Sequence, residues 1–159
     1  MVKDGDNMRI NTYDLIIQND LPMLIKERGF NYKTNDFSPK SIVNMMNEKF
    51  NLKDKAEEYV YAIGTCAKGK LVNVFPISKG TVNASLCNPR ELLIRMLLAG
   101  AVNVILIHNH PSKDVNPSKD DMNVSIRLKD ACKLIGLSFC DSIIIGGNNY
   151  CSFNECGII

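Results

Sequence analysis

The two histidines of the chain fall within one tripeptide, His108-Asn109-His110, directly after the apolar segment 102–107. That segment is rich in β-branched residues and Leu, which predicts a buried strand. Side chains two residues apart on a strand point to the same side. Neutral imidazoles that converge at a strand end are good zinc ligands. The spacing of His108 and His110 therefore predicts part of a metal site.

A carboxylate follows at a position that could complete this site. Asp121 comes after a loop that contains Pro111 and Pro117, at the start of a segment with helical periodicity. Two His and one Asp leave the fourth tetrahedral position for water, which is typical of a catalytic zinc. Two plainer explanations stay open: the histidines could belong to a polar loop, and Ser118-x-x-Asp121 could be only a capping box. Because α/β sheets place their sites at strand-to-helix junctions, we favour the metal site.

The elements that would position these residues alternate along the chain. Ser38-Pro39 and Asn88-Pro89 each place a capping residue before a Pro, which predicts helices over 39–51 and 89–98. A third helix is predicted from Ser118 to about residue 135. Runs of β-branched and aromatic residues predict strands over 22–32, 58–66, 71–77, 102–107, 137–145 and 150–153. This alternation predicts an α/β sandwich around a mixed β-sheet.

The N-terminal region carries the weakest signals. Residues 1–20 are expected to form a flexible N-terminal extension, because 12–18 has a mixed pattern and 19–22 indicates a turn. Residues 21–159 are expected to form a single domain. In its first strand, Met23, Ile25 and Phe30 are expected to face the core.

Composition excludes several classes of protein. The chain has 159 residues and a formal net charge of +2, which does not support an autonomous nucleic-acid binder with a basic patch. No apolar run approaches the ~20 residues that cross a bilayer, and the polar N-terminus lacks a secretory signal. We therefore expect a cytoplasmic protein without membrane partners. The six cysteines are expected to be buried free thiols in that reducing setting.

The spacing His108-x-His110-Pro111-x6-Ser118-x2-Asp121 resembles the signature of the JAB/MPN (JAMM) zinc metallopeptidases. Within that superfamily the chain is most similar to the RadC branch. The similar stretches are 57–60 (Glu-Glu-Tyr-Val), 80–86 (Gly-Thr-Val-Asn-Ala-Ser-Leu), 88–91 (Asn-Pro-Arg-Glu), 100–108 and 141–146. The resemblance covers roughly residues 22–159.

This resemblance implies a cytidine-deaminase-like fold, arranged as three layers around the sheet, with one zinc ion per chain. It places His108, His110 and Asp121 at the ligand positions and Ser118 at the serine that stabilises the oxyanion. The catalytic Glu of the family precedes an aromatic residue, which selects Glu58, with Glu57 as the alternative. The implied activity is hydrolysis of a peptide or isopeptide bond in a peptide or protein substrate, with Glu58 taking a proton from zinc-activated water.

Several alternatives to these assignments remain, and the chain departs from the family pattern in several places. Glu57-Glu58 could be a solvated charge pair, and Glu91 is a rival candidate for the base. The chain is too short for the helix-hairpin-helix DNA-binding region of full-length RadC proteins, and Lys113 and Ser142 stand where Gly and His are common. A second hypothesis is a RadC-family accessory protein, linked to DNA repair or mobile elements, with a non-catalytic zinc. A deaminase is excluded, because it needs Cys-rich ligands and a His-x-Glu motif.

Overall fold

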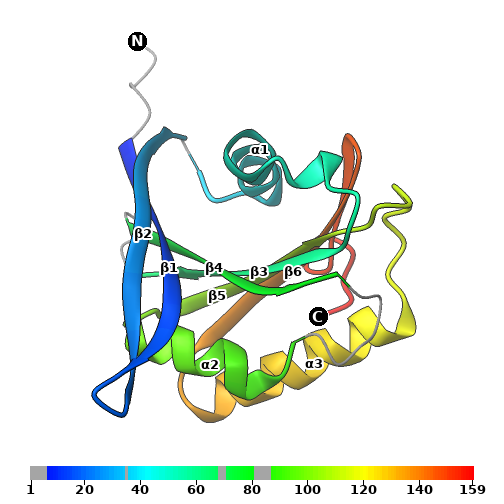
Figure 1. Cartoon of the computed structure of the whole chain (residues 1–159). Helices are drawn as coiled ribbons and strands as arrows, with labels where there is room; N and C mark the ends of the chain where they lie inside the picture. Colours follow the sequence, from blue (N-terminus) through cyan, green and yellow to red (C-terminus); the bar gives the residue numbers. More distant parts are fainter. Residues whose placement is uncertain (1–6, 35, 68–70, 81–86) are drawn as a thin grey trace.

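The computed structural model describes residues 7–34, 36–67, 71–80 and 87–159. In these ranges one mixed sheet of seven strands lies between α-helices (Figure 1). The strands are β1 (Asn7–Gln18), β2 (Leu21–Lys33), β3 (Tyr59–Thr65), β4 (Leu71–Lys79), β5 (Asn103–Asn109), β6 (Ser138–Gly146) and β7 (Asn149–Ser152). The helices are α1 (Pro39–Phe50), α2 (Pro89–Leu98) and α3 (Lys119–Leu134), and a short 3-10 helix, η1 (Leu52–Asp54), follows α1. The predicted α/β class is confirmed.

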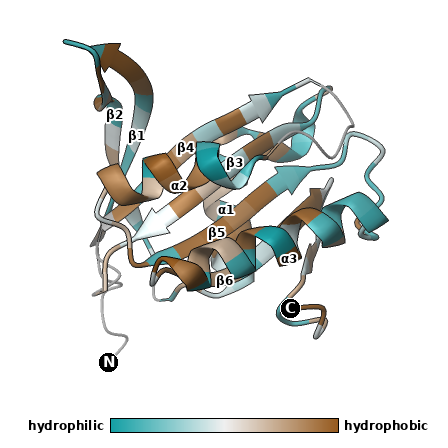
Figure 2. Ribbon diagram, turned by 90° about the horizontal axis from the view of Figure 1, so that it is seen from below, coloured by the Kyte–Doolittle hydropathy of each residue, from teal (hydrophilic) through white to brown (hydrophobic). Residues whose placement is uncertain are grey.

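The strands are ordered β2-β1-β4-β3-β5-β6-β7 across the sheet. The pairs β1/β4 and β5/β6 are parallel and the remaining pairs are antiparallel, so the sheet is mixed as predicted. Helix α1 covers one face, while α2 and α3 cover the other, which gives three layers (Figures 1 and 2). Strand β5 lies between β3 and β6 and is therefore flanked by hydrogen-bonded neighbours on both sides.

Each face of the sheet carries its own apolar core, and β5 contributes to both. Ile105 and Ile107 belong to the core beneath α1, whereas Val104 and Leu106 belong to the core beneath α2 and α3. Burial of both faces explains the nearly continuous apolar run of this strand. Because the strand is held on both faces and both edges, the residues at its C-terminal end have a fixed position.

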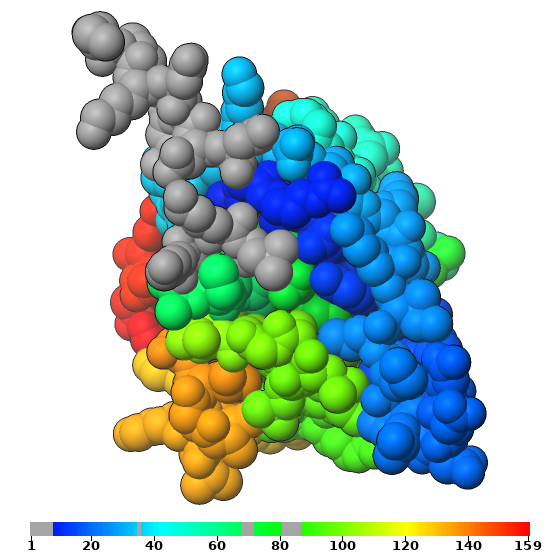
Figure 3. Space-filling view, turned by 90° about the vertical axis from the view of Figure 1, so that its left-hand side faces the viewer, coloured from blue at the N-terminus to red at the C-terminus, as the bar shows by residue number. Residues whose placement is uncertain are grey.

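The predicted boundary at residue 20 is wrong, because most of the expected extension is a strand. Strand β1 pairs antiparallel with β2 and, over Arg9–Thr12, parallel with β4. Met8 and Ile10 are buried in the core beneath α1. The turn is confirmed at Asn19 and Asp20, which both have positive φ, as a tight two-residue hairpin favours. Figure 3 looks onto this edge of the sheet, where the β1–β2 hairpin covers the right-hand side.

The expected inward face of β2 is also wrong in part. Met23 and Ile25 are 43% and 44% exposed, whereas Phe30 packs against the core beneath α1. The register shifts where Thr12 pairs with Arg28 and the next pair joins Tyr13 to Lys26. Because of this bulge, Leu24 and Phe30 pack on opposite faces of the sheet although they are six residues apart. Beyond the bulge, Leu24 rather than Met23 packs against the core beneath α2 and α3.

The structure tests two expectations drawn from composition, namely that the cysteines are buried and that no segment crosses a membrane. The six cysteines all lie in the described ranges and form no disulfide, but only Cys87 and Cys132 are buried, and Cys140 and Cys156 are exposed. The expectation of buried thiols is therefore wrong for four of the six, because Cys66 and Cys151 are only partly buried, and Cys140 on β6 and Cys156 after β7 are exposed. None of the helices in the described ranges is long and apolar enough to span a membrane.

Candidate metal centre

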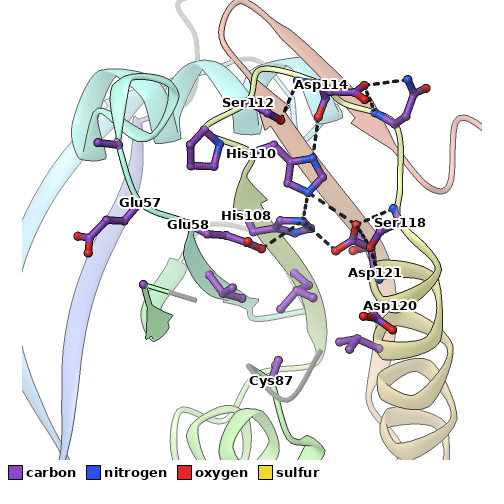
Figure 4. Close-up of a pocket in the computed structure, with 18 residues that line it drawn as sticks. Glu57, Glu58, Cys87, His108, His110, Ser112, Asp114, Ser118, Asp120 and Asp121 are labelled. Carbon is purple, nitrogen blue, oxygen red and sulfur yellow. Dashed lines mark hydrogen bonds and ion pairs between the residues drawn. The ribbon is translucent and has the colours of Figure 1, made fainter. Parts of the chain in front are cut away.

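Strand β5 brings the two histidines to one point at its C-terminal end. His108 is its next-to-last residue, and His110 follows the strand directly. The His110 backbone N–H donates to the carbonyl of Ile145 on β6 at 2.8 Å, which continues the parallel pairing by one step. The two Nε2 atoms lie 3.1 Å apart. The predicted convergence of the imidazoles is present in the structure (Figure 4).

Asp121 reaches the same point from the first turn of α3. Its Oδ1 lies 3.2 Å from His108 Nε2, and its Oδ2 lies 3.6 Å from His110 Nε2. Glu58, just before β3, places Oε1 3.9 Å from His108 Nε2. One ligand atom from each of these four residues lies within 4.8 Å of the others. The four side chains form a group that could hold a metal ion.

The spacing of the donor atoms fits zinc. Ligand atoms about 2.0–2.2 Å from a tetrahedral zinc lie about 3.3–3.6 Å from one another. The distances of 3.1 Å between the two Nε2 atoms and 3.2 Å from His108 to Asp121 are close to this range. His110 Nδ1 lies 2.6 Å from the carbonyl oxygen of Asp114, which can only accept, so Nδ1 carries the hydrogen. Nε2 of His110 therefore offers its lone pair to the centre.

Ser118 and Asp121 form the capping box that the sequence also allowed. Ser118 is the N-cap of α3, and its Oγ accepts from the Asp121 backbone N–H at 3.1 Å. In return, Asp121 Oδ2 accepts from the Ser118 backbone N–H at 2.8 Å and from its hydroxyl at 2.6 Å. Oδ1 faces His108 instead. The two explanations of this motif are therefore compatible, because Oδ2 accepts both capping hydrogen bonds while Oδ1 remains directed at His108.

The structure distinguishes the two glutamates. Glu58 points into the group, with a side chain that is 10% exposed. Glu57 points away and pairs with Lys79 at 3.0 Å, with 52% of its side chain exposed. The alternative explanation, that these glutamates are only solvated surface charges, therefore applies to Glu57 and not to Glu58. The rival Glu91 lies on α2 and pairs with Arg95 at 3.7 Å, so it takes no part in the group.

Sequence reasoning missed Asn109, which holds the segment that carries Glu58. Asn109 is 1% exposed, and its Oδ1 accepts from the Tyr59 backbone N–H at 2.8 Å. Its Nδ2 donates to the carbonyl of Glu57 at 3.0 Å. The residue between the histidines thus fixes the backbone on both sides of Glu58. Its position in the tripeptide could have signalled this role, since strand alternation turns it to the opposite face.

The ionisable side chains of this group influence one another's pKa values. Burial acts to raise the pKa of Asp121, but hydrogen bonds with both imidazoles and with Ser118 outweigh it and hold that pKa well below the usual range. The pKa of His110 is raised, chiefly by its hydrogen bond with Asp121. Burial raises the pKa of Glu58, although the nearby histidines oppose the change. Asp121 is therefore ionised, and Glu58 holds a proton more readily than an exposed glutamate.

The group lies in the wall of a cavity of about 590 Å³. Ser112, Asp114 and Ser118 line its polar side, and Cys87 lies on the opposite side of the metal group (Figure 4). Lys113, which stands where Gly is common in the family that the sequence resembles, packs against Gly147, where an added Cβ would lie about 3.5–3.9 Å from the Lys113 side-chain carbons. It therefore lies against the β6–β7 turn rather than among the residues that line the cavity.

Comparisons with known proteins identify the family of the chain. A family model described as the RadC-like JAB domain matches residues 37–158. A UPF0758 protein of Staphylococcus haemolyticus is 38% identical over 130 residues, which cover 82% of this chain and 56% of the relative. A UPF0758 protein of Clostridium acetobutylicum is 37% identical over 122 residues, covering 77% and 52% respectively. A third, from Clostridium botulinum (strain Okra / Type B1), is 35% identical over 131 residues.

The chain spans about half the length of these curated relatives. The family match nevertheless begins just before α1 and includes every residue of the metal group. The resemblance noted in the sequence is thus confirmed, and the chain belongs to the RadC-like JAB domain family.

Proposed function

We propose that the protein is a zinc-dependent hydrolase that cleaves a peptide or isopeptide bond. The observation that carries the proposal is the convergence of His108, His110 and Asp121, whose donor atoms have the spacing of a tetrahedral zinc site. Three protein ligands are typical of catalytic zinc, because a coordination position stays open. A zinc ion held there would lower the pKa of water to about 7 and polarise the substrate carbonyl.

Glu58 is the general base in this proposal. It lies beside the ligands but farther from His108 than Asp121 does, at 3.9 Å against 3.2 Å. Its carboxylate would accept the proton of the attacking water and deliver it to the nitrogen of the leaving amine. The upward shift of its pKa suits both halves of this transfer, since an efficient catalytic group has a pKa near the working pH. Asn109 would hold Glu58 in place through the backbone.

Ser118 would stabilise the negative charge that develops on the carbonyl oxygen. Its hydroxyl lies on the cavity wall and donates to Asp121 Oδ2 in the structure. The proposed role requires the hydroxyl hydrogen to turn from Asp121 to the substrate oxygen. The backbone N–H of Ser118 keeps its own hydrogen bond to Asp121 throughout, so the carboxylate stays oriented.

A direct test combines metal analysis with a substrate screen. The purified protein is expected to contain one zinc per chain and to lose it to a strong chelator. Fluorogenic libraries of linear peptides and of Lys-linked isopeptides should then be cleaved, with activity lost on chelation and restored by zinc. A zinc-loaded protein that cleaves neither class of library would overturn the proposal and favour the non-catalytic accessory role.

Replacing Ser118 by alanine should weaken both the helix and the metal site. Loss of the N-cap is expected to lower the free energy of unfolding by about 1 kcal/mol, measured by urea denaturation. Loss of the hydrogen bond to Asp121 should lower zinc affinity by about 10–100-fold, as for other partners of metal ligands.

Ser38→Ala is the matched control for this substitution. Ser38 is the N-cap of α1 and, like Ser118, accepts from the backbone N–H three residues later, that of Ser41, at 3.3 Å. It should show a similar loss of stability with unchanged zinc affinity. Equal zinc affinities for the two variants would contradict a role of Ser118 in orienting Asp121.

Zinc binding should weaken on acidification. Protons compete with the metal for the imidazole nitrogens, and the raised pKa of His110 moves this competition above the usual range for histidine. Affinity should therefore be highest above that raised pKa and should fall as the pH decreases through it. Competition with a fluorescent chelator, itself calibrated at each pH between about 5 and 8, measures the change. An affinity that is constant across this range would contradict binding through His110.

A further inference from the structure

The cavity continues beyond the metal group along the face of the sheet. Leu106 lies two residues before His108 on β5, and Val124 lies three residues after Asp121 on α3. Each therefore projects from the same side of its element as the neighbouring ligand. Val60 pairs directly with His108 across the β3–β5 ladder. All three side chains line the cavity, and Cys87 closes its far side (Figure 4).

This part of the cavity is apolar. Val60, Leu106 and Cys87 are 5%, 3% and 2% exposed, and all belong to the core beneath α2 and α3. Burial raises the pKa of Cys87 to about 12, so its thiol carries no charge. Of the carboxylates that line the cavity, Glu58 and Asp121 belong to the metal group, whereas Glu57, Asp114 and Asp120 are exposed to solvent. We call Val60, Cys87, Leu106 and Val124 the apolar floor.

One polar atom beside this floor has no partner. Ser142 on β6 is fully buried, pairs with Leu106, and lines the cavity. Its Oγ makes no hydrogen bond with any described residue. Two other buried serines do have partners, since Ser125 donates to the backbone carbonyl of Asp121 and Ser152 donates to the Asp141 carboxylate. A buried hydroxyl without a partner is costly, so this one calls for a ligand or a water in the cavity.

We propose that the apolar floor is a subsite for an aliphatic side chain next to the cleaved amide, and that Ser142 Oγ donates a hydrogen bond to a carbonyl oxygen on the same substrate residue. This inference rests on the proposed function, because the metal group defines where the cleaved bond lies. It narrows the substrate to a peptide or isopeptide with an uncharged aliphatic residue at that position. A charged side chain there would lose its hydration without gaining a partner.

Hydroxamic acids allow a test that needs no hydrolysis, because they chelate zinc directly. Calorimetry with the zinc-loaded protein compares acetohydroxamic acid with the hydroxamic acid of isocaproic acid, whose leucine-sized tail can reach the floor. The isocaproic probe has four more carbons than acetohydroxamic acid, and burial contributes about fourfold per methylene, so a fully buried tail should tighten binding by on the order of 250-fold. Equal affinities for the two probes would overturn the subsite while leaving the zinc site standing. Failure of acetohydroxamic acid itself to bind would overturn the proposed function and this inference with it.

Val124→Thr and Ile126→Thr form a matched pair on α3. Val124 lines the cavity, whereas Ile126 is 49% exposed on the same helix. Val124→Thr should reduce the ratio of the two affinities several-fold, because a hydroxyl replaces a methyl group at the floor. Ile126→Thr should leave the ratio unchanged. A ratio that responds equally to both substitutions would contradict the placement of the tail.

The hydrogen bond of Ser142 is tested with a second pair of probes. The hydroxamic acid of levulinic acid has nearly the shape of the isocaproic probe but carries a ketone oxygen in place of one methyl group. Ser142→Ala should weaken the levulinic probe by roughly three- to tenfold relative to the isocaproic one. An unchanged ratio would show that Ser142 does not recognise a carbonyl oxygen.

Discussion

Glu58→Gln is expected to lower the rate of amide hydrolysis by about 10²–10⁴, the usual loss for a missing general acid–base group. Glutamine keeps the size of the side chain but cannot accept the proton of the attacking water. Glu58 stands beyond the three nearer ligand atoms of the metal group, so zinc should stay bound. The melting temperature should change little, because the substitution removes a charge that burial disfavours.

Glu57→Gln provides the control for this substitution. Glu57 is the adjacent residue with the same side chain, but it is exposed and pairs with Lys79 outside the metal group. Its replacement should leave the rate within about twofold, since exposed ion pairs contribute little. Initial rates are measured on a cleaved substrate at equal zinc content. Full activity of Glu58→Gln with zinc bound would exclude Glu58 as the base.

His108→Ala and Asp121→Ala should each abolish stoichiometric zinc binding. Both remove one of three converging donors, and the remaining two cannot complete a tetrahedral site. Zinc that binds only the folded protein stabilises it by about 2.7 kcal/mol at one hundred times its Kd. The melting temperature of the unaltered protein should therefore rise on zinc addition, while those of the two variants should not.

Asp120→Ala separates this effect from a general loss of charge at the helix start. Asp120 lies beside Asp121 in the first turn of α3 but is exposed. Both carboxylates interact favourably with the helix dipole, yet only Asp121 faces the imidazoles. Asp120→Ala should therefore retain one zinc per chain. Zinc retained in full by both His108→Ala and Asp121→Ala would refute the ligand set.

The parts of the fold that the sequence predicts well are those with local signals. Helices α1 and α3 begin at the predicted serines, because the capping hydrogen bonds involve residues three apart. Helix α2 begins at the predicted Pro89, but Asn88 makes no side-chain cap hydrogen bond and instead accepts from Arg127 at 3.4 Å. That partner comes from a distant helix and could not be read from the local pattern.

The β1–β2 hairpin was beyond local reasoning for a different reason. Which residues of this hairpin are buried depends on a bulge and on which helix covers each part of it. Met23 and Ile25 are therefore exposed, although they alternate like core residues. At the metal group, the residue types and their spacing along the chain were enough to predict that the two imidazoles and Asp121 converge. The same reasoning could not separate Glu57 from Glu58, because that choice depends on how Asn109 holds the backbone across the sheet.

The position of β1 has a consequence for how the chain folds. Strands β1 and β4 are hydrogen-bonded neighbours, although β2, α1 and β3 lie between them along the chain. The β1–β2 and β3–β4 hairpins can each form from nearby residues, but joining them in parallel must first close a long loop. Non-local pairings of this kind slow folding more than local ones do. We therefore expect the β1–β4 pairing to form later than the two hairpins that it joins.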